Sequence, residues 1–498
     1  MMRASTTHVD ERFVCVNKSG KQVSSDYDIG RVVGSGAFGE VRTVCSKRTG
    51  EVCALKVVAK EDTELVVLSR ELEILSGLDH PHIARMFDVY EDRRCVHMVL
   101  EMCEGGDLVD VIQSSTQGLR EADAFRLTGQ LLWAVSYLHS KCIAHRDVKL
   151  DNLLLKEKVG DVALAQVKLI DFGMSKRFDS YNRLRTVGGT ALYAAPEIMS
   201  GVNPGHRDAY YTEKVDVWSC GVSCYVLLTR RFPFDGPSDA SILENASRAK
   251  VRFRASERIS EEGRKLVARL LTRAVSKRPS AAEAMAALDA LMASAGDANM
   301  QGEKSAERGE VALLKSLEAF RGRNRLEKHA RRLMARKTSD SLFPDLQAEF
   351  RRMDTAGTGV ISFENFKAGM AATGFTDAEC LADLFQQVDT DGSQEIDYTE
   401  FLAVAMDRAL TENRGHLCHE AFRLLDKDNS GTVSVEEIAE AMASPDAGDA
   451  CSLSEAAALL CDADTDGDGQ VSYEEFHALM TRGLRSPTKS KSVALLGA

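Results

Sequence analysis

The feature that most constrains the fold is a fourfold repeat near the end of the chain. Acidic twelve-residue loops begin at Asp354, Asp389, Asp426 and Asp464, at spacings of 35, 37 and 38 residues, and apolar helical stretches flank each loop. Units of this size cannot bury their apolar faces alone, so they must pair with a neighbour. We therefore expect an all-α region over residues 344–484.

The loops carry oxygen-bearing side chains at alternate positions, as calcium binding requires. Calcium takes oxygens from loop positions 1, 3, 5, 7 and 9 and both oxygens of a Glu at position 12. Position 8 is always Ile or Val, which suits a short strand pairing two loops. One acidic loop can be an unrelated turn, but four in register cannot. The repeats resemble EF-hands, with loops at residues 354–365, 389–400, 426–437 and 464–475.

The third and fourth loops have complete sets of ligands for calcium. Both also have the Gly at position 6 that the sharp turn of such a loop needs. We expect calcium to bind Asp426, Asp428, Ser430, the Thr432 carbonyl and Glu437 in the third loop, and Asp464, Asp466, Asp468, the Gln470 carbonyl and Glu475 in the fourth.

The first and second loops depart from this pattern. The second has Gln394 at position 6, where a positive φ costs a residue other than Gly roughly 1–2 kcal/mol. The first has Ala356 at position 3 and Asn365 at position 12, so it lacks the bidentate carboxylate. We expect the first loop to serve only as a structural partner. We expect the second to bind calcium with reduced affinity, through Asp389, Asp391, Ser393, the Glu395 carbonyl and Glu400.

The stretch HRDVKLDN at 145–152 carries the chemistry of phosphoryl transfer to a hydroxyl. Asp147 can orient the incoming hydroxyl, Lys149 can neutralise the moving phosphoryl group, and Asn152 can hold a metal ion. Asp171, in KLIDFG at 168–173, is the second expected metal ligand. Two oxygen ligands together with phosphates suit Mg²⁺, which keeps several of its waters.

A glycine-rich stretch lies upstream, with Gly34, Gly36 and Gly39 in GxGxxG spacing. A dinucleotide-binding fingerprint needs a helix directly after its glycines. Here the chain continues as a strand, turns, and returns as a strand that carries Lys56. The glycines can therefore lie over phosphates while Lys56 reaches the α- and β-phosphates of a nucleotide.

In order along the chain, the glycine loop, Lys56, HRDVKLDN, DFG and AAPE resemble a serine/threonine protein kinase over residues 27–291. The resemblance implies a bilobal α+β fold. It implies that Glu71, nine residues before His80, pairs with Lys56, whereas Glu73 is a solvated helix acid. It also implies that an ion pair between Glu197 and Arg278 braces the lobe and that Asp216 supports the backbone of the catalytic loop. Glu101 and Cys103 would present backbone groups to adenine. The implied ATP-site residues are Gly34, Ser35, Gly36, Ala37, Phe38, Gly39, Val41, Ala54, Lys56, Glu101, Cys103 and Asp171.

Residues 292–343 join the two regions. A small, polar linker is followed over 311–337 by a strongly basic stretch with apolar residues at helical spacing. A basic amphipathic helix is the kind of target that calmodulin binds. It can also occupy a substrate cleft lined by acids, lie on a membrane surface or remain solvated. The EF-hand repeats favour the calmodulin-like interpretation, and Gly322 leaves open whether the helix is broken.

Kinase, basic junction and EF-hands in this order resemble the calcium-dependent protein kinases over nearly the whole chain. The resemblance implies a multidomain α+β protein in which the 311–337 junction inhibits a kinase that uses ATP and Mg²⁺, and Ca²⁺ relieves the inhibition. The expected partners are Ser/Thr protein substrates with a basic residue upstream, selected by Glu104 and Asp107 unless these form only a solvated acidic turn. The alternative is a catalytically inactive kinase that acts as a calcium-dependent scaffold.

Composition limits the partners and the cellular location that we expect for the protein. Net charge is −12, which argues against general nucleic-acid binding. Twelve cysteines without paired metal-binding spacing, including Cys220 and Cys224 in an apolar run, indicate reduced thiols in a cytoplasmic protein, with the nucleus as an alternative. We expect no transmembrane helix and no lipid anchor, since Met2 stands where myristoylation needs Gly. Residues 1–26 and 485–498 are expected to be a flexible leader and tail.

Overall fold

The computed structural model places the chain in two compact units, which are described separately: residues 1–298 with 356–358, and residues 299–355 with 359–498. The described residues are 22–36, 39–47, 50–61, 64–115, 118–178, 190–200, 212–294, 313–337, 344–371, 375, 377–411, 415–428, 430–442 and 451–482. Within these residues no helix combines the length and apolar character needed to cross a membrane.

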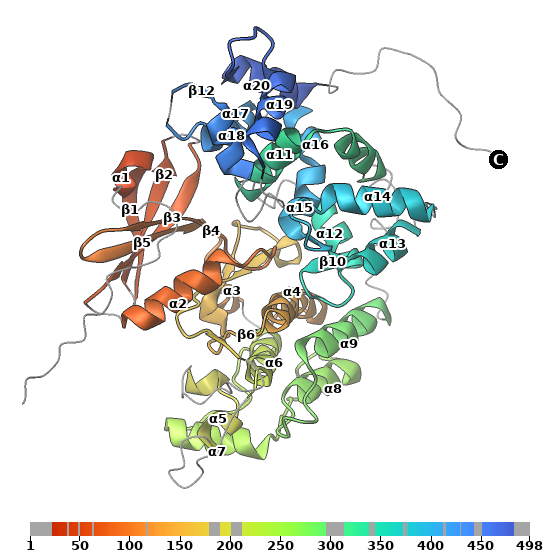
Figure 1. The fold of residues 1–498 in the computed structure, drawn as a ribbon. Helices are drawn as coiled ribbons and strands as arrows, with labels where there is room; N and C mark the ends of the chain where they lie inside the picture. The colour runs from red at the N-terminus through yellow and green to blue at the C-terminus, as the bar shows by residue number, and fades with distance from the viewer. Residues whose placement is uncertain are drawn as a thin grey trace, which may run out of the picture. The chain divides into compact units, whose positions relative to one another are not determined.

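The first unit begins with a five-stranded antiparallel sheet of order β1-β2-β3-β5-β4 (Figure 1). Helix α2 (Leu65–Ser76) belongs to the same lobe and buries Leu68, Leu72 and Leu75. Its 3.6-residue apolar spacing explains why this stretch is a helix. The strands are β1 (Tyr27–Gly36), β2 (Gly39–Ser46), β3 (Val52–Ala59), β4 (Met86–Glu91) and β5 (Cys95–Glu101).

Ordered structure in this lobe begins four residues before residue 27, within the stretch expected to be a flexible leader. Residues Val23–Asp26 form a short helix, α1. Val23 is buried in a cluster with Tyr27 and Tyr90, and the Tyr90 hydroxyl donates to Asp26 at 2.7 Å. Burial of an apolar side chain therefore fixes the end of the stretch assigned to a leader. Residues 1–21 and 483–498 lie outside the described residues.

Helices dominate the rest of the first unit. Helix α4 packs against α6 and α9, and α6 buries nearly all its residues, including Cys220 and Cys224, as its uniform apolar sequence predicts. The elements are α3 (Leu108–Ser114), α4 (Glu121–Ser140), β6 (Ile143–Ala144), β7 (Leu153–Leu155), β8 (Val167–Leu169), β9 (Lys176–Arg177), α5 (Glu197–Ser200), α6 (Lys214–Thr229), α7 (Asp239–Arg248), α8 (Glu261–Leu270) and α9 (Ala281–Ser294), with 3-10 turns at Leu150–Asn152, Val162–Leu164 and Ala191–Tyr193.

The second unit contains four helix–loop–helix repeats, as predicted. Ile361 pairs with Ile396 and Val433 with Val471, so the position-8 residues join the loops two by two. The elements are α12 (Pro344–Met353), β10 (Val360–Ser362), α13 (Phe363–Ala371), α14 (Ala378–Val388), β11 (Glu395–Asp397), α15 (Tyr398–Val404), α16 (Met406–Thr411), α17 (Gly415–Leu425), β12 (Thr432–Val433), α18 (Val435–Met442), α19 (Leu453–Ala463), β13 (Val471–Ser472) and α20 (Tyr473–Thr481).

The junction consists of two helices, which settles the question that Gly322 raised. Residues 313–321 are helical, and α11 (Arg325–Lys337) begins after a break at residues 322–324. Asn324 starts the new helix, because its Oδ1 accepts from the Glu327 amide at 2.8 Å and the Glu327 carboxylate accepts from the Asn324 amide at 3.1 Å. This reciprocal capping satisfies two amides that would otherwise lack partners. Helix α11 packs against α15, α16 and α17 within the second unit (Figure 1).

Candidate phosphoryl-transfer site and calcium loops

Strand β3 and helix α2 bring Lys56 and Glu71 together. Lys56 Nζ lies 2.7 Å from Glu71 Oε1 and 3.6 Å from Asp171 Oδ1. Burial lowers the pKa of Lys56, but the two carboxylates outweigh burial, and the net shift is upward. The ammonium group is therefore fixed and charged. Glu73 is exposed instead and lies 3.5 Å from Arg177 Nε.

The glycine-rich stretch forms the end of the β1–β2 hairpin. Gly36 pairs with Gly39, which has φ +128°, and a Cβ there would lie 1.9 Å from the Val57 carbonyl oxygen. Gly39 is thus required by both backbone conformation and space. Ala37 and Phe38 lie outside the described residues. Val41 pairs with Lys56 and Ala54 pairs with Leu100, which places both on rungs of the sheet beside Lys56.

The strand that leads to the expected adenine contacts ends at Glu101. Its carboxylate is buried, 2.6 Å from Lys156 Nζ and 3.1 Å from Lys168 Nζ. Because both carboxylate oxygens pair with lysines, the backbone groups of Glu101 are the ones left to contact a nucleotide. Motif spacing gave no sign of the two lysines. Burial raises the pKa of the Cys103 thiol to about 12, so this residue stays protonated.

The catalytic-loop residues form one hydrogen-bonded group. Asp147 Oδ2 lies 2.8 Å from Lys149 Nζ and accepts from Asn152 Nδ2 at 3.1 Å. Asn152 Nδ2 also donates to the Asp147 carbonyl at 2.8 Å, and Lys149 Nζ donates to Thr190 at 3.4 Å. These bonds hold the carboxylate in one orientation, as positioning of a substrate hydroxyl requires.

Two buried polar systems lie in the same lobe, and the first of them supports this loop. Asp216 accepts from the backbone amides of His145 and Arg146 at 2.9 and 2.8 Å, and Arg146 has φ +70°. These bonds offset the strain of that backbone conformation. Arg278, which is fully buried, makes a two-pronged pair with Glu197 at 2.6 and 3.0 Å.

The residues fit a magnesium ion. Asn152 uses its amide nitrogen on Asp147, so its amide oxygen is the atom suited to a metal. The Ile170 amide donates to the Asn152 carbonyl at 3.0 Å, which brings Asp171, the next residue, beside Asn152. Asp171 has φ +63°. An amide oxygen and a carboxylate are the hard ligands that Mg²⁺ prefers.

Loops two, three and four each gather three carboxylates, at positions 1, 3 and 12. In each loop one oxygen from every member lies within 4.8 Å of the others, which fits a calcium ion. In loop four, Glu475 accepts from the Ser472 amide at 2.9 Å and the Thr465 amide at 2.7 Å. These hydrogen bonds, chiefly that of Ser472, lower the pKa of Glu475 to about 2. In loop three, Glu437 accepts from Lys427 and Ser434 in the same way.

Position 6 has a positive φ in all four loops. The values are +73° at Gly359, +65° at Gln394, +88° at Gly431 and +82° at Gly469. The strained turn expected in loop two is therefore present. In loop one, Asp354 is buried and accepts from the Gly359 amide at 2.8 Å. Loop one pairs with loop two through β10 and β11, while its failure to bind calcium stays a prediction.

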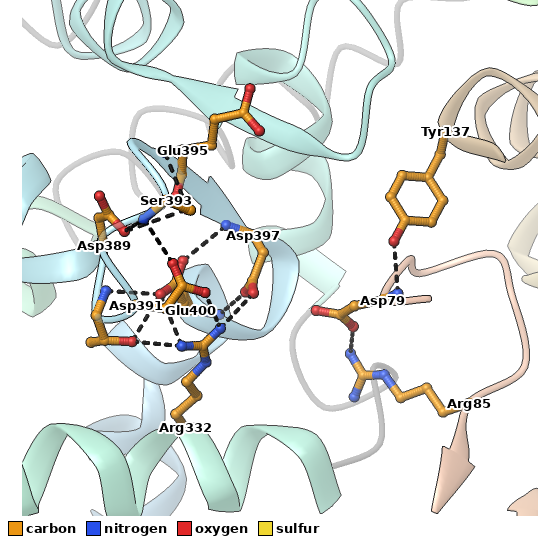
Figure 2. A network of polar contacts seen from close by, with 11 residues as sticks. Asp79, Arg85, Tyr137, Arg332, Asp389, Asp391, Ser393, Glu395, Asp397 and Glu400 are labelled. Atoms are coloured by element: carbon orange, nitrogen blue, oxygen red, sulfur yellow. Dashed lines mark hydrogen bonds and ion pairs between the residues drawn. The ribbon is translucent and has the colours of Figure 1, made fainter. Parts of the chain in front are cut away.

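Loop two also contains a cation from the junction, which sequence analysis missed. Arg332 of α11 lies 3.0 Å from Asp391, 2.7 Å from Asp397 and 3.2 Å from Glu400 (Figure 2). Asp397, at position 9, was not among the predicted ligands, although its place in the loop pattern could have identified it. Nothing in the sequence distinguished Arg332 from the other basic residues of the junction.

Comparison with known proteins agrees with both units. The protein kinase domain model matches residues 27–288, and models of an EF-hand domain pair match residues 357–408 and 417–481. Calcium-dependent protein kinase 2 of Zea mays is 32% identical over 96% of this chain and 90% of its own length. Calcium-dependent protein kinase 4 of Plasmodium berghei is 30% identical over 91% of this chain and 85% of its own length. The chain belongs to the calcium-dependent protein kinase family and is a protein serine/threonine kinase.

Proposed function

We propose that this kinase transfers the γ-phosphoryl group of Mg·ATP to Ser or Thr of proteins when calcium occupies its EF-hands. The supporting observation is the Lys56–Glu71 pair beside an ordered Asp147–Lys149–Asn152 group. Lys56 holds the α- and β-phosphates. Asn152 and Asp171 would hold the metal, which would supply positive charge against the phosphates.

Asp147 has the central role in the transfer step. It accepts a hydrogen bond from the substrate hydroxyl and directs the oxygen at the γ-phosphorus, while Lys149 stabilises the charge on the moving group. The 2.8 Å contact between Lys149 and Asp147 holds the carboxylate in this orientation. Substrate selection through a basic residue rests on Glu104, which is exposed, and on Asp107, whose Oδ1 also caps α3 by accepting from Asp110.

Calcium control acts through the junction, residues 311–337. Its inhibitory role is proposed by analogy with the family. The proposal that EF-hands capture the junction has support within the second unit, where α11 buries Leu326, Ala330 and Met334 and packs on α15 and α17. Calcium opens EF-hand helix pairs and exposes apolar grooves, which can bind such a face and withdraw the junction from its inhibitory place.

The first test is phosphate transfer from Mg·ATP to a basic Ser/Thr peptide, with calcium and with a chelator. We expect transfer only with calcium. Asp147→Asn should lower kcat by about a hundredfold or more while ATP still binds. Equal transfer in both conditions would disprove calcium control but not the kinase. ATP binding without transfer in either condition would instead indicate the scaffold.

The second test changes position 12 of the two complete calcium loops together. Glu437→Gln with Glu475→Gln removes one bidentate ligand from each loop but keeps a side chain able to cap the following helix. We expect calcium activation to be lost while transfer in the chelator stays at its low basal level. A rise of activity with calcium in this double variant would contradict the proposed switch.

A further inference from the structure

Arg332 is seated inside the second calcium loop. Its guanidinium donates to Thr390 Oγ1 at 2.9 Å, Asp391 Oδ2 at 3.0 Å and Asp397 Oδ2 at 2.7 Å, and it lies 3.2 Å from Glu400 Oε1. Only 3% of its side chain is exposed. Figure 2 shows the side chain rising from α11 into the loop, among these residues. Loop positions 2, 3, 9 and 12 all contact this one cation.

The neighbouring arginine shows that this placement is specific. Arg331 is also fully buried on α11, but it pairs with Asp407 of α16 at 2.6 Å and donates to the Met480 carbonyl at 3.0 Å. Neither partner belongs to a calcium loop. Within the described part of the chain, no Lys or Arg forms an ion pair with the carboxylates of positions 1, 3 and 12 in loops three and four.

The guanidinium uses the oxygens that calcium needs. Calcium binding requires Asp391 at position 3 and both oxygens of Glu400 at position 12. A guanidinium is a fixed fork of N–H donors that suits carboxylates, whereas calcium must have those oxygens directed at itself. Two cations also cannot share a buried group of carboxylates without strong repulsion. Arg332 and calcium therefore exclude one another from loop two.

We propose that Arg332 is an internal competitor of calcium at loop two, so that an ion entering this loop must displace the guanidinium and free this one contact of α11. The proposal rests on the proposed function, since it takes loop two as a calcium site. Calcium binding and displacement of Arg332 are thermodynamically linked. The free energy that Arg332 contributes to holding α11 is subtracted from the free energy of calcium binding to the loop. Loop two is thereby coupled directly to the junction, in addition to the capture of α11 by apolar grooves.

The test measures calcium binding to the full-length chain by calorimetry, without ATP or a substrate. Glu437→Gln and Glu475→Gln are built into the background so that loop two dominates the titration. Adding Arg332→Met keeps the length of the side chain and removes its charge, and we expect the Kd to fall by about tenfold. Lys315→Met removes an exposed charge from the same junction, and it should leave the Kd unchanged. An unchanged or higher Kd in Arg332→Met, or absence of binding in both chains, would overturn the proposal.

A measurement on the wild-type chain covers the case in which Arg332→Met does not fold. Modification by an arginine-selective dicarbonyl, mapped by mass spectrometry, should be slow at Arg332 in chelator and at least several-fold faster in calcium. Arg321, whose side chain is 50% exposed, is the internal reference and should react in both. Continued protection of Arg332 at saturating calcium would overturn the proposal. Because neither measurement involves phosphoryl transfer, an inactive kinase would not alter the result.

Discussion

Loops two and four have nearly the same ligands but different surroundings. In both, a Glu at position 12 reaches back to the residue that caps its helix, Asp397 in loop two and Ser472 in loop four. In loop four this bonding lowers the pKa of Glu475 to about 2. In loop two, burial and neighbouring Asp397 raise the pKa of Glu400, and Arg332 opposes this rise.

The difference shows that the same ligand pattern can stand in two different electrostatic environments, and we expect calcium affinity to depend on both. Loop four offers at position 12 a carboxylate, that of Glu475, whose pKa is lowered by hydrogen bonds from its own loop. Loop two offers carboxylates that are packed together, partly desolvated and balanced by a cation from another segment. Calcium must replace water in the first case and a bound guanidinium in the second.

The largest effect should come from position 12. Glu475→Gln should weaken calcium binding at loop four on the order of a hundredfold, because it removes the bidentate carboxylate. Glu400→Gln should weaken loop two by only about tenfold, because it also removes one anchor of the competing Arg332. Calcium titration with ion counting by native mass spectrometry measures both. Equal losses would show that the two loops do not differ as described.

Thermal unfolding in chelator tests the role of Arg332 in loop two, with an expected effect of intermediate size. Arg332→Met leaves the carboxylates of loop two without their cation, and it should destabilise the second unit by about 2 kcal/mol, below the full cost of breaking a fully buried pair. Calcium should remove most of this loss, since the ion supplies the missing charge. Arg321→Met breaks the more exposed pair with Asp383 and should cost less than about 1 kcal/mol in either condition. Calorimetric melting curves decide between these outcomes.

The smallest effect should come from the turn at position 6. Gln394→Gly should stabilise the second unit by about 1 kcal/mol, since Gly adopts a positive φ without the penalty of a Cβ. The mirror change Gly469→Gln should destabilise it by about 1–2 kcal/mol, and no atom lies within 4 Å of the added Cβ, so the change reports on the backbone alone. Chemical denaturation of both variants in chelator gives the two values. Opposite signs are expected, and equal signs would contradict the role of φ.

The parts that could be predicted from the sequence are those fixed by local spacing. The four loops, the position-8 strands and the buried helix around Cys220 follow from periods of two, 3.6 and about 36 residues, because nearby residues determine these structures. The family order of motifs likewise identified Glu71 rather than Glu73 as the partner of Lys56. In the structure, Lys56 Nζ lies 2.7 Å from Glu71 Oε1.

The parts that could not be predicted depend on contacts between distant segments. Arg332 is 59 residues from Asp391, and several basic residues of the junction had the same sequence signature. Which of them enters a calcium loop depends on the rotation of α11, and this rotation is set by packing against α15 and α17. The helix at Val23–Asp26 was not predicted for the same reason: Val23 belongs to a buried cluster that includes Tyr90, far along the chain.

The two adjacent arginines of α11 have a consequence for the dose response. Arg332 is held by the first pair of EF-hands, while Arg331 is held by Asp407 and by Met480 of α20, in the last EF-hand. Helix α11 is thus held by contacts with both pairs of EF-hands. Loss of the contacts of α11 with one pair weakens its contacts with the other. The calcium occupancies of the two pairs should therefore rise together. We expect a graded calcium signal to be converted into a steeper, more threshold-like output than independent loops would give.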